Sequence, residues 1–155
     1  MPFHTLLQWL RPASADELLA LERYRAAIVS VAQQTQDMSE RWLAFAQLES
    51  DAERLANTAA VNRWELAMMG ERLRELQVPR PAAATDRDVR RSLTSLTRAF
   101  QLLANGYRFH KSDAVCDGQA LLVDRVGRLQ AASRQLHERQ PRVATTAVTR
   151  GSSAS

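Results

Sequence analysis

Apolar residues recur every seven positions along the first half of the chain. No Pro or Gly interrupts the span from Ala13 to Met69. The repeated positions are Tyr24, Val31, Met38, Phe45, Ala52, Ala59, Leu66 and Leu73, and further apolar residues accompany them at a spacing of three or four. A heptad pattern of this length is typical of long helices that pack side by side with a left-handed crossing. The first half is therefore expected to be helical.

The boundaries of this helical half follow from capping patterns. Ser14 with Glu17 three residues later is a capping box, so a helix is expected to begin there. Two places could interrupt it, residues 36–39 and residues 49–51, where Ser50 and Glu53 repeat the capping-box pattern. One continuous helix and two shorter helices both fit the pattern. We favour a break, because a single rod needs an equally long partner.

The second half shows two further apolar stripes. Pro79 and Pro81 end the first half, and Thr85 with Asp88 is the expected cap of the next helix. The first stripe contains Val89, Leu93, Leu96, Phe100, Leu103 and Tyr107, and the second contains Val115, Leu122, Val126, Leu129 and Leu136. The phase shifts between residues 106 and 113, where Ser112 could cap another helix. These stripes predict a third and a fourth helical segment, or one hinged helix.

Together the patterns predict an all-α fold, an antiparallel bundle of long helices. Four helical segments are favoured, and a long coiled-coil-like hairpin is the alternative. We expect residues 1–13 to form a short amphipathic segment, residues 14–140 the bundle, and residues 141–155 a disordered tail rich in Thr, Ser and Ala.

Composition agrees with helix. The 155 residues include 25 alanines but only five glycines and five prolines, and Ala has the highest helix propensity. The single cysteine, Cys116, excludes an internal disulfide and favours a reducing compartment. No apolar run has the length of a membrane span, and the N-terminus does not resemble a secretory signal. The expected location is the cytoplasm.

Charge is divided unevenly between the halves. Residues 15–78 hold 11 acids and 7 bases, whereas residues 79–141 hold 6 acids and 11 bases. Folding the halves together about Ala82 would bring Arg87, Arg91 and Arg98 near Glu75, Glu71 and Glu65, respectively. We therefore expect much of the charge asymmetry to be used in ion pairs inside the fold.

One cluster carries residue types found in catalytic or metal sites. His110, Asp113, Cys116 and Asp117 would share one face if this region were helical throughout. No second histidine lies nearby in sequence, and the Glu-x-x-His motif of di-iron bundles is absent. A solvated helix corner is therefore the favoured interpretation, and the sequence predicts no enzyme, no cofactor and no metal site.

Among Met38, Trp42, Trp64, Met68 and Met69, the two that fall outside the heptad series and its accompanying positions are Trp64 and Met68. A bulky aromatic residue there packs on another helix or meets a partner. The N-terminal segment adds Phe3, Leu7 and Trp9 as candidate partner-binding residues, although folding back over the end of the bundle is the favoured interpretation of this segment. We therefore expect a non-enzymatic interaction module, such as an adaptor, chaperone-like or accessory subunit. It is expected to form a homodimer, to bind another protein, or both.

The alternative function is nucleic-acid binding through an arginine-rich face. The candidate phosphate-binding residues are Arg80, Arg87, Arg90, Arg91, Arg98, Arg108 and Lys111. Basic faces provide the electrostatic part of nucleic-acid binding. Asp86 and Asp88 interleave with these bases, and no aromatic residue for base stacking accompanies them, so this hypothesis ranks second.

Overall fold

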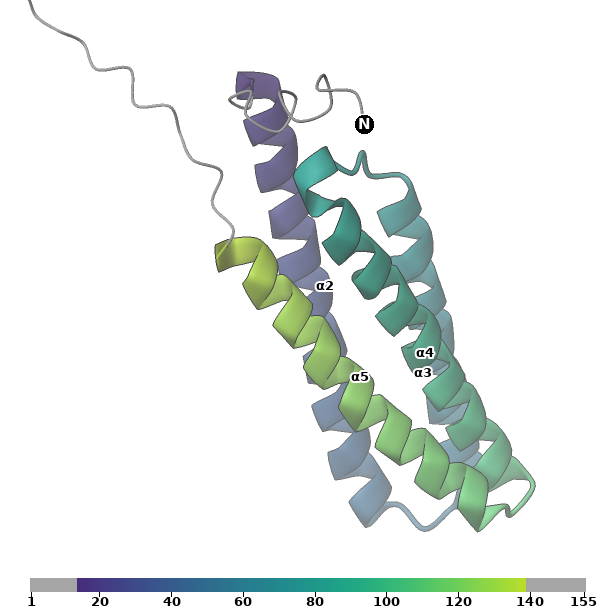
Figure 1. Cartoon of the computed structure of the whole chain (residues 1–155). Helices are drawn as coiled ribbons and strands as arrows, with labels where there is room; N and C mark the ends of the chain where they lie inside the picture. The colour runs from purple at the N-terminus through teal and green to yellow at the C-terminus, as the bar shows by residue number, and fades with distance from the viewer. Residues whose placement is uncertain (1–13, 139–155) are drawn as a thin grey trace, which may run out of the picture.

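The computed structural model describes residues 14–138, and this part of the chain folds as a four-helix bundle without strands (Figure 1). The elements are α2 (Ala15–Leu48), α3 (Ala52–Arg74), the short 3-10 helix η1 (Arg80–Ala82), α4 (Ala83–Arg108) and α5 (Ser112–Glu138). The predicted all-α bundle with four helical segments is confirmed. The expectations for residues 1–13 and 141–155 lie outside the described residues.

The structure resolves where the first helical half breaks. α2 continues through residues 36–39 and ends before Glu49, so only the second of the two expected interruptions is present. The Ser14 capping box is confirmed: the Glu17 amide donates to Ser14 Oγ at 3.2 Å, and Glu17 Oε2 accepts from the Ser14 amide at 2.9 Å. α3 is capped by Asp51 rather than Ser50, because Asp51 Oδ1 accepts from the Glu53 amide at 2.9 Å.

The predicted cap of α4 is wrong. Thr85 is buried inside the first turn instead of preceding the helix, which begins at Ala83 directly after η1. The reason lies in Pro81, whose fixed φ suits the first turn of a helix and lets the chain start winding early. Asp86, which follows in the first turn of α4, is buried.

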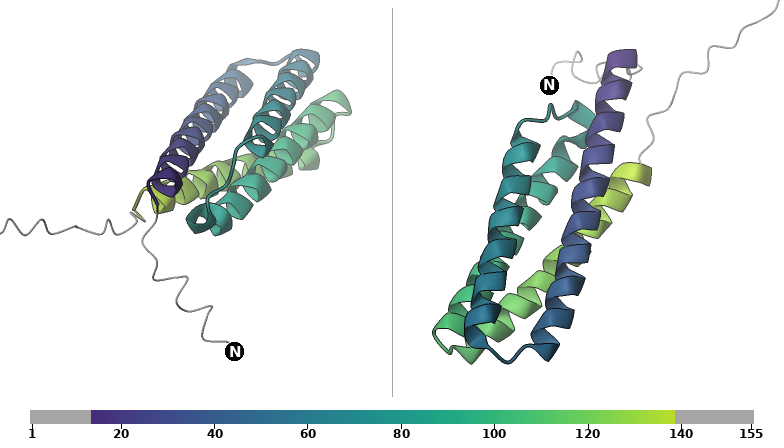
Figure 2. Two further views of the ribbon diagram at one scale, coloured as in Figure 1. Left: turned by 90° about the horizontal axis from the view of Figure 1, so that it is seen from above. Right: turned by 180° about the vertical axis from the view of Figure 1, so that it is seen from behind.

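α4 lies at the centre of the packing and contacts α3 and α5 closely along their lengths. α2 leans mainly on α5, and its backbone approaches that of α3 at few places (Figure 2). Gln130 of α5 donates to the Ala32 carbonyl at 2.8 Å, and Arg25 donates to the Leu136 carbonyl at 2.9 Å. These two hydrogen bonds tie α2 to α5.

Trp42 anchors α2 in the core with only 1% of its surface exposed. Its ring packs edge-on against Phe100 with the centroids 5.7 Å apart, and against Tyr107 at 6.1 Å. Edge-to-face pairs of this kind add to the stabilisation that burial provides. Its indole nitrogen has no hydrogen-bond partner within residues 14–138.

A buried polar network joins three helices. The Tyr24 hydroxyl donates to Asp86 Oδ1 at 2.7 Å, and Arg90 Nε donates to Asp86 Oδ2 at 2.7 Å. Arg90 Nη2 also donates to the Leu73 carbonyl at 3.0 Å. The network connects α2, α4 and the end of α3, and it satisfies polar groups that would be costly to bury alone.

This network replaces the ion pairs expected from the charge asymmetry. In the part of the chain that the structure describes, none of Arg87, Arg91 and Arg98 pairs with a glutamate of α3 or of the segment after it. That expectation is wrong, because ion pairing depends on how each helix is rotated about its axis. The rotation of α4 directs Arg90, not its neighbours, towards α3.

Substituting Tyr24 with Phe tests this network. Burial and the hydrogen bond to Asp86 raise the pKa of Tyr24 well above its ordinary value. The folded state therefore keeps a proton that the unfolded chain loses as pH rises through about 10, so stability falls above that pH. Tyr24→Phe should lower the free energy of unfolding by about 1–3 kcal/mol at neutral pH, because Asp86 loses a donor.

The same variant should also flatten the fall in stability above about pH 10, as measured by urea denaturation at several pH values. Tyr107, the other tyrosine, is the matched control. Its pKa is raised by burial and by Cys116, but no hydrogen bond of its hydroxyl is seen within the described residues. Tyr107→Phe should therefore cost less at neutral pH. An equal loss in both variants would contradict the importance of the network.

Candidate functional site

The outer face of α3 exposes a row of apolar side chains. Val61 is 55% exposed, Trp64 64% and Met68 37%. The exposed Ala67 and the partly buried Ala60, which also packs against the core, lie beside them at the same three- and four-residue spacing, so all five residues share one side of the helix. We call Ala60, Val61, Trp64, Ala67 and Met68 the outer stripe.

The opposite side of α3 is also apolar. Leu55, Leu66 and Leu73 are fully or almost fully buried against the bundle. A helix at the surface of a globular protein is normally polar on its outer side, whereas one that is apolar on both sides is normally covered on both. α3 therefore carries apolar residues on two sides in its middle turns, and within residues 14–138 one of these sides is covered.

A groove borders the outer stripe. It lies between α2 and α3, has a volume of about 550 Å³, and is lined by Gln34, Asp37, Met38, Glu40, Arg41, Glu65 and Met69. Val61 and Met68 stand four residues before and three residues after Glu65, so they adjoin the α3 wall of the groove. The apolar surface of the stripe thus meets a rim rich in carboxylates.

Part of this surface was predicted from the sequence. Trp64 and Met68 were predicted, and they lie together in the structure, whereas Val61 was not predicted. The available signal was the spacing, because Val61 precedes Trp64 by three residues and Met68 follows by four. Phe3, Leu7 and Trp9, the other predicted partner-binding residues, lie outside the described part of the chain.

The structure separates the predicted phosphate-binding residues. Arg87, Arg91 and Arg98 are exposed and share one side of α4, while Arg90 is half-buried in the polar network. Arg80 is exposed at the opposite end of the bundle from Arg108 and Lys111. The basic face suggested by the sequence is therefore reduced to a row of three arginines on α4.

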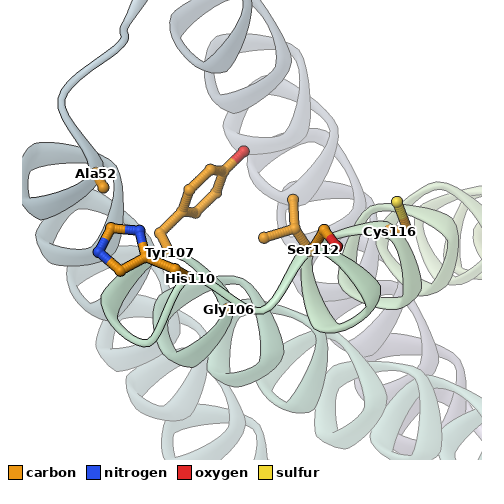
Figure 3. A pocket seen from close by; sticks show the side chains of 7 residues that line it. Ala52, Gly106, Tyr107, His110, Ser112 and Cys116 are labelled. Carbon is orange, nitrogen blue, oxygen red and sulfur yellow. The ribbon is translucent and has the colours of Figure 1, made fainter.

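A pocket opens at the end of the bundle where α3 begins and α4 turns into α5 (Figure 3). We call it the bundle-end pocket. Its volume is about 330 Å³, and its lining consists of Ala52, Gly106, Tyr107, His110, Ser112, Val115 and Cys116. Tyr107 and His110 lie on the side of Ala52, and Ser112 and Cys116 come from α5 across from them.

The turn beside this pocket explains why the expected helical face is not formed. The chain leaves α4 through His110, which has a left-handed backbone with φ of 53°. The Lys111 amide donates to the Gly106 carbonyl at 2.8 Å, and the His110 amide donates to the Tyr107 carbonyl at 3.4 Å. These bonds form the Schellman motif that ends many helices.

The turn places His110 and Cys116 at one pocket, without Asp113 and Asp117 among its lining residues. Within residues 14–138 no three His, Cys, Asp or Glu side chains form a group that could hold a metal ion.

Comparison with known proteins found no match among family models, curated proteins or solved structures. None of the helices in the described region combines the length and apolar character needed to cross a bilayer. The class of protein is therefore defined by its fold, an all-α four-helix bundle.

Proposed function

We propose that this protein is a non-enzymatic helical interaction module that self-associates through the outer stripe of α3. The observation that supports it is the exposed Trp64 between Val61 and Met68, on a helix whose other side is already buried. Exposed apolar surface of this kind marks interaction sites. Tryptophan is also enriched among the residues that dominate binding energy.

The spacing of the stripe favours a second copy as the partner. Relative to Trp64, the other four residues stand at positions −4, −3, +3 and +4. This pattern is unchanged when the helix direction is reversed. Two copies of α3 can therefore pack antiparallel about a two-fold axis at Trp64, with Val61 of each opposite Met68 of the other. Closed two-fold dimers are the commonest oligomers and require such a self-complementary surface.

The alanines of the stripe fit the same arrangement. Ala60 and Ala67 are seven residues apart on one edge, so they leave room for a partner helix to approach closely. A specific interface buries about 800 Å² on each partner. The stripe therefore supplies the apolar centre, and the walls of the groove between α2 and α3 supply a polar rim.

Capture between two differently tagged copies tests the proposal. One tagged copy should retain the other, and Val61→Asp in both copies should abolish capture because it places a charge in the centre of the contact. Val123→Asp is the matched control, since Val123 is a 57% exposed valine on α5, away from the stripe. Equal capture by the two variants would contradict the assignment.

Nucleic-acid binding is the second candidate function, favoured by the exposed row of Arg87, Arg91 and Arg98 on α4. The capture experiment separates the two candidates. Capture through the outer stripe should persist after nuclease treatment, whereas loss of capture with nuclease would transfer the assignment to the arginine row.

A further inference from the structure

The bundle-end pocket is an open hollow with a volume of about 330 Å³, which is large enough to hold part of a small molecule. Gly106 forms a buried floor, while His110, Ser112 and Cys116 are exposed around the opening. A Cβ atom at Gly106 would stand 2.7 Å from Val115 Cγ2 and 2.9 Å from the Val115 amide nitrogen, so the absence of a side chain lets α4 and the start of α5 approach closely beside the pocket.

The polar groups of the pocket are few, and they come from separate segments. Tyr107 lines the pocket from α4, and Ser112 and Cys116 line it from α5. The ordinary pKa of a tyrosine lies well above neutral, and burial and the neighbouring Cys116 raise the pKa of Tyr107 further, so its hydroxyl is protonated at neutral pH. The remaining wall is apolar, from Ala52 and Val115.

Nearby charged groups have other contacts. Asp51 caps the start of α3 by accepting from the Glu53 and Arg54 amides. The Lys111 ammonium stands over the Phe109 ring, 6.0 Å from its centroid. No carboxylate, Lys or Arg is among the lining residues. A charged ligand would lose hydration here without gaining an opposite charge, so the walls favour a neutral one.

His110 reaches the pocket through the turn that ends α4. Its left-handed backbone belongs to the Schellman motif of this turn, and the side chain of His110 lines the pocket.

We propose that the bundle-end pocket binds a small neutral molecule with one or two rings and a single hydrogen-bonding group, such as a phenol. The ring lies against Ala52 and Val115, and its polar group pairs with the Tyr107 hydroxyl. This site is separate from the outer stripe of α3, so the proposal does not depend on self-association.

Cys116 provides a direct readout because it is the only cysteine of the chain and is exposed at the pocket. The experiment measures the rate at which iodoacetamide alkylates Cys116 in the full chain, with increasing phenol or 2-naphthol. Saturable protection is expected, about tenfold when the probe exceeds its Kd about ninefold. Benzoate and benzylammonium, charged molecules of similar size, should protect much less.

Matched variants locate the protection. Ala52→Phe fills the pocket from the first turn of α3 and should remove protection by the phenols. Ala84→Phe, an exposed alanine in the first turn of α4, should leave it unchanged. Tyr107→Phe keeps the ring and should weaken binding about tenfold through loss of one hydrogen bond. Circular dichroism checks that each variant is folded.

Three results would overturn the proposal. They are no saturable protection by either phenol, equal protection by the charged molecules, and equal protection of the Ala52→Phe and Ala84→Phe variants.

Discussion

Replacing Trp64 with alanine is expected to convert a dimer into a monomer at micromolar concentration. Truncating a central interface tryptophan typically costs 2 kcal/mol or more. A two-fold contact contains the residue twice, so the loss is about 4 kcal/mol, or about a thousandfold in Kd. Because Trp64 is mostly exposed in the single chain, its removal should leave the helical content unchanged.

Phe109 is the matched control for this prediction. It is a 59% exposed aromatic residue at the end of α4, away from the outer stripe. Phe109→Ala removes a similar apolar group without touching the proposed contact. Sedimentation velocity of both variants at several concentrations gives the comparison. A dimer that survives Trp64→Ala, or an equal loss in both variants, would show that the stripe is not the contact.

The second large effect is expected at Gly118, where α4 and α5 cross closely. A Cβ atom there would lie 2.8 Å from Leu103 Cγ and 3.0 Å from the Ala99 carbonyl oxygen. The carbonyl belongs to the backbone and cannot rotate away, so the helices must separate. Gly118→Ala should therefore lower the free energy of unfolding by about 1–3 kcal/mol.

Replacing Gly127, on the same helix, with alanine is expected to have the opposite effect on stability. No atom lies within 4 Å of a Cβ built at Gly127. Gly127→Ala should raise the free energy of unfolding by about 0.5–1 kcal/mol, because alanine loses less conformational entropy in a helix. Urea denaturation of the two variants measures both. If the variants change stability in the same direction, the close crossing at Gly118 is contradicted.

Much of the fold could be predicted because it depends on local patterns. The heptad series places Tyr24, Met38 and Leu66 in the core, and all three are buried there. The capping box at Ser14 and the helix end after Arg74 follow from short-range hydrogen bonding and from the prolines that come next. Such signals act within a few residues, so they survive in any packing.

The polar network could not be predicted for the opposite reason. Tyr24 and Asp86 are separated by 62 positions, and their contact depends on the rotation of α2 and α4 about their axes. Arg90 was predicted to bind phosphate, whereas in the structure it donates hydrogen bonds to Asp86 and to the Leu73 carbonyl near the end of α3. Neither charge pattern nor periodicity distinguishes Arg90 from its neighbour Arg91.

The candidate sites were partly accessible to sequence reasoning. Trp64 stood out because a large aromatic lay outside the heptad series, and the structure exposes it. The turn at His110 was suggested by a shift in apolar phase. Its left-handed backbone could not be anticipated, because glycine is the usual residue in that conformation. The pocket forms only when the start of α3 meets that turn.

The most direct test of self-association is the mass of the unaltered full-length chain by sedimentation equilibrium across a wide range of concentrations. The account predicts twice the chain mass at micromolar concentration, with dissociation to the single chain on dilution. A single-chain mass at every concentration up to the highest that can be reached would contradict it.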